Sequence, residues 1–243
     1  MINKTIHYCW FGGSPLPPLA KKCIESWKKY CPDYEIKEWN EKNFDINCNQ
    51  YVKEAYEAKK YAFVSDYVRL YALYTEGGIY MDTDVEVIKS IDEFLKDEAF
   101  LGFETIDTIS TGIMGAREKH PFFNLLLQYY TNKSFINKDG SYDMTTNVET
   151  ITKYCLKNGL KTNNTLQDIN GFILYPKEYF CPKDHQTGKI YLHKNTYTIH
   201  HFAGSWVPRK SKIKKYIIRI LGPRITSKIV ICKKKIYSIV RRG

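Results

Sequence analysis

The stretch YAFVSDYVRLYALYTEGGIYMDTDVEVI, residues 61–88, decides the fold that this sequence predicts. Its first half places apolar residues at helical spacing: Phe63, Tyr67, Leu70, Leu73 and Tyr74. The pair Gly77-Gly78 then supplies the left-handed stop expected after a helix C-terminus. From Ile79 to Ile88, β-branched and aromatic residues alternate with small or charged ones, which is typical of a strand that runs into a loop. The stretch therefore predicts helix, turn and strand.

Two acids one residue apart are the first candidate site residues. On a strand, Asp82 and Asp84 point to the same side with Cα atoms roughly 7 Å apart, so their carboxylates can converge on one divalent cation. Carboxylate oxygens suit Mg²⁺ or Mn²⁺, whose octahedral sites are completed by water and substrate phosphates. Asp66 and Arg69, three residues apart, share one helix face and can act on the same ligand, although a surface ion pair is the simpler reading of that pair alone.

The segment SDYVRLYALYTEGGIYMDTDV resembles the signature of the DxD-containing sugar transferases of glycosyltransferase family 32. That family includes fungal Golgi mannosyltransferases and bacterial enzymes of capsule and cell-surface polysaccharide synthesis. Two more blocks follow the family's order, IHYCWFGG at 6–13 and IHHFAGSW at 199–206. The resemblance implies an α/β protein with the nucleotide-diphospho-sugar transferase (GT-A, Rossmann-like) fold, whose central sheet is mixed and mainly parallel.

The resemblance also implies roles for the central residues. Asp84 would bind the metal directly, while Asp82 would hold it through water or contact the ribose. Asp66 and Arg69 would hydrogen-bond the hydroxyls of the donor sugar. Ser65 and Tyr80 would line the same pocket.

The two outer blocks would complete this site. In the distantly related glucosylating toxins an equivalent Trp stacks on the nucleotide base, and Trp10 stands in the matching position, where a core aromatic beside a strand is the alternative. One histidine would join the metal ligands. His200 and His201 would face opposite ways on a strand, and analogy with related retaining enzymes favours His200. Ser205 and Trp206 would contact the diphosphate.

The implied reaction is a metal-dependent, retaining transfer of a sugar from a nucleotide-diphosphate donor to a saccharide or lipid-linked saccharide acceptor. The cation would stabilise the departing diphosphate as a Lewis acid. No dedicated nucleophile is evident; Glu104 follows an apolar run, Phe100 to Phe103, but an ordinary carboxylate at a strand end is favoured. One alternative is a metal-dependent nucleotidyltransferase or phosphohydrolase using Asp82 and Asp84. The donor, the acceptor and the oligomeric state stay open.

The rest of the chain alternates strands and helices, as expected of a nucleotide-binding sheet. The glycines of Phe11-Gly12-Gly13 follow the first strand, at the edge where ligands bind in open α/β sheets, and predict a tight turn beneath the base. The spacing of a phosphate loop is absent. The predicted elements are strands over 4–10, 34–39, 112–116 and 171–175, an apolar stretch over 100–103, and helices over 18–30, 121–130 and 147–157.

Length and composition fit one catalytic domain, predicted over 1–208. The sequence shows neither a signal-peptide pattern nor 18 uninterrupted apolar residues, so secretion and a membrane span are not expected. The seven cysteines form no C-x-x-C pair and no zinc spacing. They predict reduced thiols in a cytoplasmic protein.

The net charge of +11 is concentrated at the C-terminus. Residues 209–243 hold 13 of the 37 Lys and Arg and no Asp or Glu, which leaves 24 basic against 26 acidic residues before them. Apolar residues at helical spacing predict a basic amphipathic tail there: Ile213, Tyr216, Ile217, Ile220 and Leu221. Such a tail suits the anionic inner face of a membrane, where a lipid-linked acceptor would lie. Packing of its apolar face on the catalytic domain is one alternative. Nonspecific nucleic-acid binding is another, but no recognition motif accompanies the charge, so no nucleic-acid partner is expected.

Overall fold

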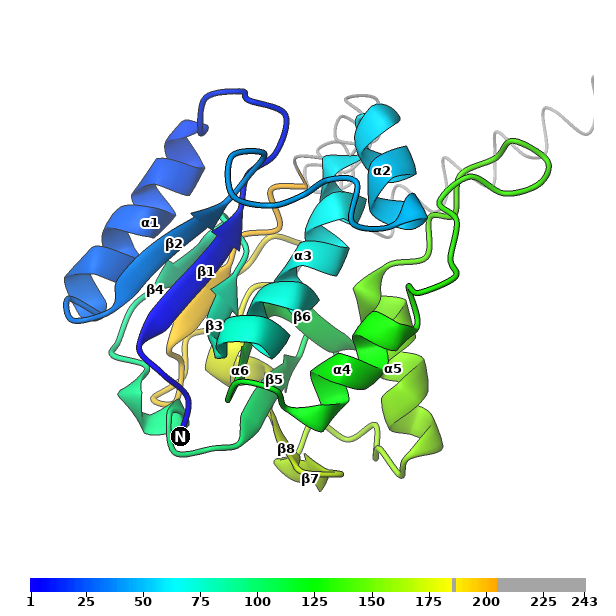
Figure 1. Ribbon diagram of the computed structural model, residues 1–243. Helices are drawn as coiled ribbons and strands as arrows, with labels where there is room; N and C mark the ends of the chain where they lie inside the picture. Colours follow the sequence, from blue (N-terminus) through cyan, green and yellow to red (C-terminus); the bar gives the residue numbers. More distant parts are fainter. Residues whose placement is uncertain (185–186, 205–243) are drawn as a thin grey trace, which may run out of the picture. The chain divides into compact units, whose positions relative to one another are not determined.

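The computed structural model describes residues 1–184 and 187–204, and its centre is a seven-stranded sheet in the order β2-β1-β3-β6-β5-β8-β7 (Figure 1). The pairs β1 with β2, β1 with β3 and β5 with β8 are parallel. The pairs of β6 with β3 and with β5, and of β7 with β8, are antiparallel. Five of the seven strands therefore run in one direction, against β6 and β7. This confirms the predicted α/β fold with a mixed, mainly parallel sheet.

Most of the elements that the sequence predicts have the expected bounds within one or two residues, and the strand expected over 112–116 begins three residues earlier. The strands of the large sheet are β1 Thr5–Cys9, β2 Glu35–Trp39, β3 Gly78–Met81, β5 Ala99–Phe103, β6 Ile109–Ala116, β7 Gln167–Ile169 and β8 Phe172–Tyr175. A second, two-stranded sheet pairs β4 Val85–Val87 with β9 Thr198–His200. The helices are α1 Pro18–Tyr30, α2 Gln50–Glu57, α3 Tyr61–Glu76, the short 3₁₀ helix η1 Asp92–Phe94, α4 Pro121–Gln128, α5 Asn147–Lys157 and α6 Lys177–Phe180.

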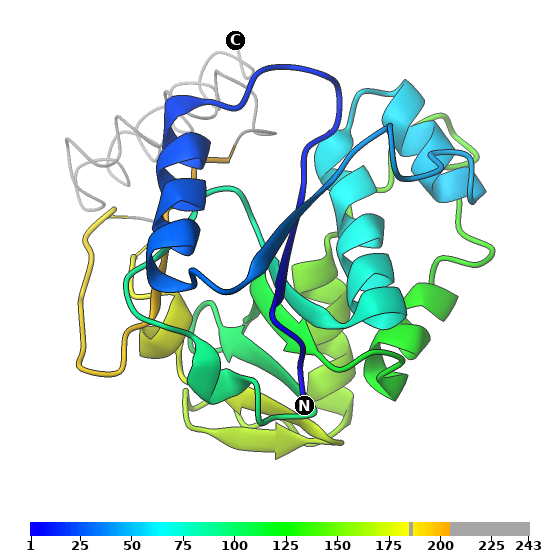
Figure 2. The ribbon, with the colours of Figure 1, turned by 60° about the vertical axis from the view of Figure 1, so that its left-hand side comes forward.

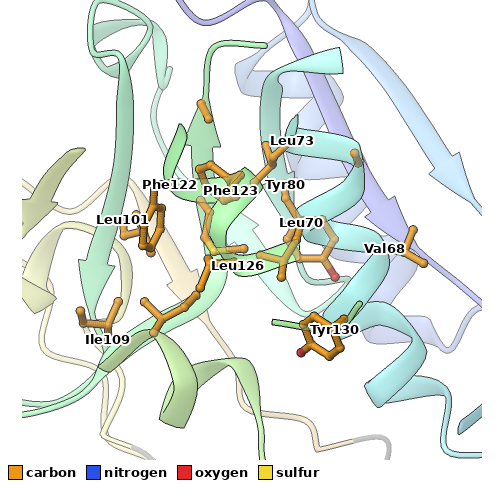
Figure 3. Close-up of a cluster of buried hydrophobic side chains, with 14 of the residues drawn as sticks. Val68, Leu70, Leu73, Tyr80, Leu101, Ile109, Phe122, Phe123, Leu126 and Tyr130 are labelled. Atoms are coloured by element: carbon orange, nitrogen blue, oxygen red, sulfur yellow. The ribbon is translucent and has the colours of Figure 1, made fainter. Parts of the chain in front are cut away.

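Helices cover both faces of the large sheet, so the hydrophobic core has two parts. Strand β3 alternates between them: Tyr80 lies in the cluster with α3 and α4, while Ile79 and Met81 lie in the cluster with α1. Figure 2 shows α1 and α3 on opposite sides of β1. Figure 3 shows the α3 side, where side chains of α3 and α4 meet those of the strands. The period of two in the strand thus sets which face each side chain serves.

Helix α3 ends at the predicted glycine pair. Gly77 and Gly78 have φ angles of +68° and +90°, a region that side-chain-bearing residues rarely adopt. A Cβ atom on Gly77 would lie 2.7 Å from the backbone nitrogen of Glu118. The chain therefore turns sharply from α3 into β3, so that the end of β3 faces the middle of α3.

The strand predicted from Ile79 was expected to carry Asp82 and Asp84 before it runs into a loop, and this part of the prediction is wrong. The chain leaves the large sheet after Met81, and the amide of Val85 donates to the carbonyl of Asp82 at 3.0 Å, which closes a tight turn. Asp residues favour such turns because their side chains bond to nearby backbone amides and tolerate turn conformations. Strand β4 then pairs with β9 rather than with the large sheet. The two acids therefore lie in a turn between two sheets.

Residues 1–182 and 192–201 form one compact unit, which holds every element named above. In the second unit, Lys183 and Ile190 form an antiparallel bridge. The predicted tail over 209–243, and with it the predicted boundary at residue 208, lies outside the described residues. Among the described helices, none is both long and apolar enough to cross a bilayer. The six cysteines in the described part of the chain are free, and five of them are buried.

Candidate active site

The acidic turn meets a histidine at the carboxyl edge of the large sheet. The Nε2 atom of His200 lies 3.3 Å from Asp84 Oδ1 and 4.0 Å from Asp82 Oδ2. One ligand atom from each of the three residues lies within 4.8 Å of the other two. Two carboxylates and one imidazole form a donor set that suits Mn²⁺ and other divalent first-row cations. These residues fit the predicted metal site.

The acidic neighbours of His200 raise the pKa of its imidazole. Burial lowers the pKa of this imidazole, but the adjacent Asp84 carboxylate raises it, and the net result is a pKa well above the ordinary value. The raised pKa favours the protonated imidazole beside the two carboxylates. Because a metal binds the neutral imidazole, cation binding at this site would release a proton.

Asp82 is held by one of its two carboxylate oxygens. The hydroxyl of Tyr80 donates to Asp82 Oδ1 at 2.8 Å, and Arg69 Nη2 lies 3.2 Å from the same atom. The second oxygen, Oδ2, is the one nearer to His200. The ring of Tyr80 is buried and lies 4.7 Å from the Arg69 guanidinium carbon. Tyr80 thus helps to fix the position of the Asp82 carboxylate.

Arg69 connects the helix, the sheet and the acidic turn. Its Nε donates to the carbonyl of Ser65 at 3.2 Å, and its Nη1 donates to both the carbonyl and the hydroxyl of Thr111 at 2.9 Å. Its Nη2 lies 3.3 Å from Asp66 Oδ1 and 3.2 Å from Asp82 Oδ1. A guanidinium has five N–H donors. The protein therefore offers Arg69 five acceptor atoms, and the side chain is only 7% exposed.

Asp66 joins α3 to the start of α5. Its Oδ2 accepts the backbone amide of Asn147 at 3.0 Å, and its carbonyl accepts the Asn147 side-chain amide at 2.6 Å. A carboxylate at a helix N-terminus is stabilised by the unpaired amides there. Burial raises the pKa of Asp66, while Arg69 and the Asn147 amide act in the opposite direction. Asp66 and Arg69 thus form a buried pair, which excludes the surface ion pair considered from the sequence.

The two adjacent histidines have different neighbours. His200 lies opposite Val85 in the β4–β9 pair and joins the acidic turn. His201 bonds Glu86 Oε2 through Nε2 at 2.8 Å, and Lys22 approaches the same carboxylate at 3.0 Å. The partial burial of Glu86 raises its pKa, but the bonds from Lys22 and His201 outweigh this and lower it on balance. Of the two histidines expected near the metal, the structure brings His200 to the acidic pair.

Comparison with known proteins agrees with this geometry. The family model described as "Glycosyltransferase sugar-binding region containing DXD motif" matches residues 17–101, which run from the N-terminus of α1 into β5 and include the acidic turn. Residues 17–101 are thus similar to the sugar-binding region of the DXD-containing glycosyltransferases.

Several named proteins are similar to this chain. An uncharacterized glycosyltransferase, L373, of Acanthamoeba polyphaga mimivirus is 26% identical over 91% of this chain and 92% of its own length. Inositol phosphoceramide mannosyltransferase 3 of Schizosaccharomyces pombe is 31% identical over 54% of this chain, which spans 37% of the yeast protein. A solved glycosyltransferase "involved in the glycosylation of the major capsid of PBCV-1" is 13% identical, with a TM-score of 0.43 over 86% of this chain and 98% of its own.

The other residues expected in the candidate site lie around the ends of β1 and β5 and in α3, or outside the described residues. Trp10 is half-buried at the end of β1, and its indole N–H donates to the carbonyl of Ser14 at 2.5 Å. The next turn uses Gly12 and Gly13 with φ angles of +89° and +63°, as expected of a tight turn. The hydroxyl of Ser65 donates back to the carbonyl of Tyr61 at 3.0 Å. Ser205 and Trp206 lie outside the described residues. Glu104 follows β5, and its amide donates to the carbonyl of Thr108 in the turn toward β6.

Three further residues contact the candidate site and were not assigned to it from the sequence. Thr111 and Gly112 in β6 contribute backbone carbonyls, which accept from Arg69 and from the amide of Asp82 respectively. Asn147 binds Asp66 through its backbone and side-chain amides. A backbone group is common to all residue types, so no pattern of letters could identify the first two.

Proposed function

We propose that this chain is a divalent-cation-dependent, retaining glycosyltransferase that moves a sugar from a nucleoside-diphosphate donor to a saccharide or lipid-linked acceptor. The observation that carries the proposal is the convergence of Asp82, Asp84 and His200 at the carboxyl edge of β3. Strand β1 lies next to β3 and ends at Trp10 and the Gly12-Gly13 turn, so the expected base-binding segment flanks the expected metal site. Ligands of open α/β sheets bind along such an edge.

The residues divide into those that face the donor and those that orient them. When bound, Mn²⁺ or Mg²⁺ would act as a Lewis acid for the diphosphate leaving group. Asp84 and His200 would hold the cation, with Oδ2 of Asp82 as a further ligand or as a contact through water. Ser205 and Trp206 stay predicted diphosphate contacts, and Trp10 stays the predicted stacking partner of the base.

Arg69 acts in this proposal mainly as a positioning residue. Its Nε and Nη1 groups donate to three acceptors within the protein, and its Nη2 forms ion pairs with Asp66 and Asp82. A direct bond from Arg69 to a sugar hydroxyl, which the family resemblance implies, would therefore replace an existing contact. Asp66 has a carboxylate bonded to the start of α5, so a sugar hydroxyl bound there would lie beside α5.

The proposed acceptor class and the proposed cellular location are supported by the sequence and by the named relatives. The fission-yeast relative is named a mannosyltransferase of inositol phosphoceramide, which supports mannose as one donor sugar to test and a membrane lipid as one acceptor class. The basic segment 209–243 supports docking of the enzyme on the anionic inner face of a membrane, in a cytoplasmic enzyme. The biological role that we propose for such an enzyme is cell-surface or capsular polysaccharide synthesis.

The decisive experiment is donor profiling with the full chain. Thermal shift and donor hydrolysis are measured with UDP-glucose, UDP-galactose, their N-acetyl forms and GDP-mannose, each with and without Mn²⁺. We expect one donor to stabilise the protein only when Mn²⁺ is present, and Asp84→Asn to abolish that metal-dependent shift. Lys28→Gln, which changes an exposed side chain of α1, is the matched control and keeps the shift.

Three outcomes would contradict the proposal. Donor binding that ignores Mn²⁺ would exclude metal dependence, and unchanged turnover by Asp84→Asn would exclude the acidic turn as the site. Nucleotide transfer or phosphate-ester cleavage without a sugar acceptor would indicate a nucleotidyltransferase or phosphohydrolase. The configuration of the released sugar, read by NMR, tests retention separately.

A further inference from the structure

Gly112 lies in the middle of β6, directly against the imidazole of His200. A Cβ atom built on Gly112 would be 2.7 Å from His200 Nδ1, 2.8 Å from Cε1 and 3.4 Å from Cγ. Real Cβ atoms essentially never approach another heavy atom closer than 3.0 Å. The histidine ring thus occupies the space that any side chain at position 112 would need.

The backbone itself does not demand glycine at this position. Gly112 is not among the glycines with positive φ, so its strand conformation is open to other residues. Glycine in a strand interior weakens the strand, and it often marks a close approach of another group. The approach of the His200 ring is such a reason.

The His200 ring is held on its other sides as well. Asp84 Oδ1 lies 3.3 Å from Nε2, and the thiol of Cys181 interacts with the imidazole. Cys181 is itself placed by β6, because its Sγ donates to the hydroxyl of Ser110 at 3.4 Å. With Gly112 on one side and these two residues around it, the ring has little room to rotate without losing its contact with Asp84.

We propose that Gly112 is a positioning residue that sets the divalent-cation affinity of the site by leaving space for His200 beside Asp82 and Asp84. The proposal rests on the proposed function, because it takes these three residues as the cation ligands. The same glycine also fixes the acidic turn, since its carbonyl accepts the amide of Asp82 at 2.8 Å. Gly112 thus acts on two of the three proposed ligands: it leaves space for the ring of His200, and its carbonyl bonds the amide of Asp82.

The test measures Mn²⁺ affinity, which a purely structural role would not move. Mn²⁺ is titrated into the full chain and free Mn²⁺ is followed by EPR. Residues that orient metal ligands change affinity by about 10–100-fold when they are replaced, so we expect at least a tenfold weaker binding for Gly112→Ala. Gly115→Ala is the matched control: it lies on the same strand, and its Cβ would meet Phe100 at 2.2 Å instead of His200. It should lower the melting temperature and leave Mn²⁺ affinity unchanged.

A double-mutant cycle with His200→Ala isolates the contact. If Gly112 acts through the ring, the tenfold effect of Gly112→Ala shrinks to less than about twofold when His200 is already Ala, and the double variant melts at a higher temperature than Gly112→Ala alone. The melting comparison stays informative even if Gly112→Ala folds poorly. Equal losses in both backgrounds, or unchanged affinity in Gly112→Ala, would overturn the proposal. A wild-type chain without saturable Mn²⁺ binding would instead overturn the proposed function.

Discussion

Replacing Arg69 by Met tests how the buried charge network is stabilised. Met keeps the apolar stem of the side chain and removes all five donors. The carboxylate of Asp66, whose side chain is only 10% exposed, then loses its cationic partner. Asp82 Oδ1 keeps the Tyr80 hydroxyl, and the carbonyl of Thr111 loses its Arg69 donor.

The expected loss of stability is large for a single substitution. Removing one partner of a buried ion pair costs about 3–5 kcal/mol, because a charge remains buried without compensation. For a chain of this size, each kcal/mol lowers the melting temperature by roughly 2–4 °C. The variant should therefore melt roughly 6–20 °C below the wild type at neutral pH.

The loss should also depend on pH, with a definite sign. Burial raises the pKa of Asp66 and the Arg69 charge opposes that rise, so Arg69→Met raises this pKa further. Between the unfolded-state pKa and the higher folded-state pKa, the folded protein binds more protons than the unfolded one. The free energy of unfolding then falls as pH increases. The variant should accordingly be closest to the wild type in mild acid and furthest from it at neutral pH.

Urea unfolding of both proteins at several pH values from 5 to 8 measures this difference. The double variant Arg69→Met/Asp66→Asn is the control, since it removes the stranded charge and should recover part of the lost free energy at neutral pH. A loss below about 1 kcal/mol, or one that does not change with pH, would refute the view that Arg69 compensates a buried carboxylate.

Three further predictions concern other parts of the fold and the site. Glu54→Gln should cost about 1.5–3 kcal/mol in urea unfolding, because Oε2 of Glu54 accepts three donors from residues 134–136. Partial burial raises the pKa of Glu54, but these bonds lower it on balance below its ordinary 4.5. The stability lost in Glu54→Gln should therefore vanish as the pH falls through the folded-state pKa and Glu54 becomes protonated. A loss that persists in acid would contradict this. Gly77→Ala should lower the free energy of unfolding by roughly 2 kcal/mol or more. This loss should clearly exceed that of Gly140→Ala, which also has a positive φ but whose Cβ would meet nothing within 4 Å. Equal losses would exclude the clash with Glu118. Glu86→Gln should raise the rate of amide exchange in β4 and β9, because it removes a charge-assisted bond to His201, and unchanged exchange would show that this bond does not hold the pair.

The long helices with a clear period could be predicted from the sequence, and several short elements could not. The helices Pro18–Tyr30 and Asn147–Lys157 have the predicted bounds, because proline or a threonine cap marks the start and the apolar spacing fills the body. The helix Gln50–Glu57 and the strand Gln167–Ile169 were missed. Short elements have too few residues to show a period, and their formation depends on partners distant in the chain.

The site shows a similar division between local and distant information. Asp82 and Asp84 could be identified because their side chains stand one residue apart, although the geometry that joins them is a turn rather than the period of a strand. The proximity of His200 needed the resemblance, since 116 positions separate it from Asp84. Gly112 contributes through an absent side chain, which a sequence alone does not distinguish from any other strand glycine.

The register of the small sheet decides which histidine meets the acids. His200 lies opposite Val85, the residue directly after Asp84, and the amide of His201 donates to the carbonyl of Asp84 at 2.9 Å. In a strand, adjacent side chains point to opposite faces, so a slip of one position would exchange the two histidines. In the observed register, His201 bonds Glu86 of β4. The bond of His201 to Glu86 therefore favours the pairing of β4 and β9 in which His200 faces the acidic turn.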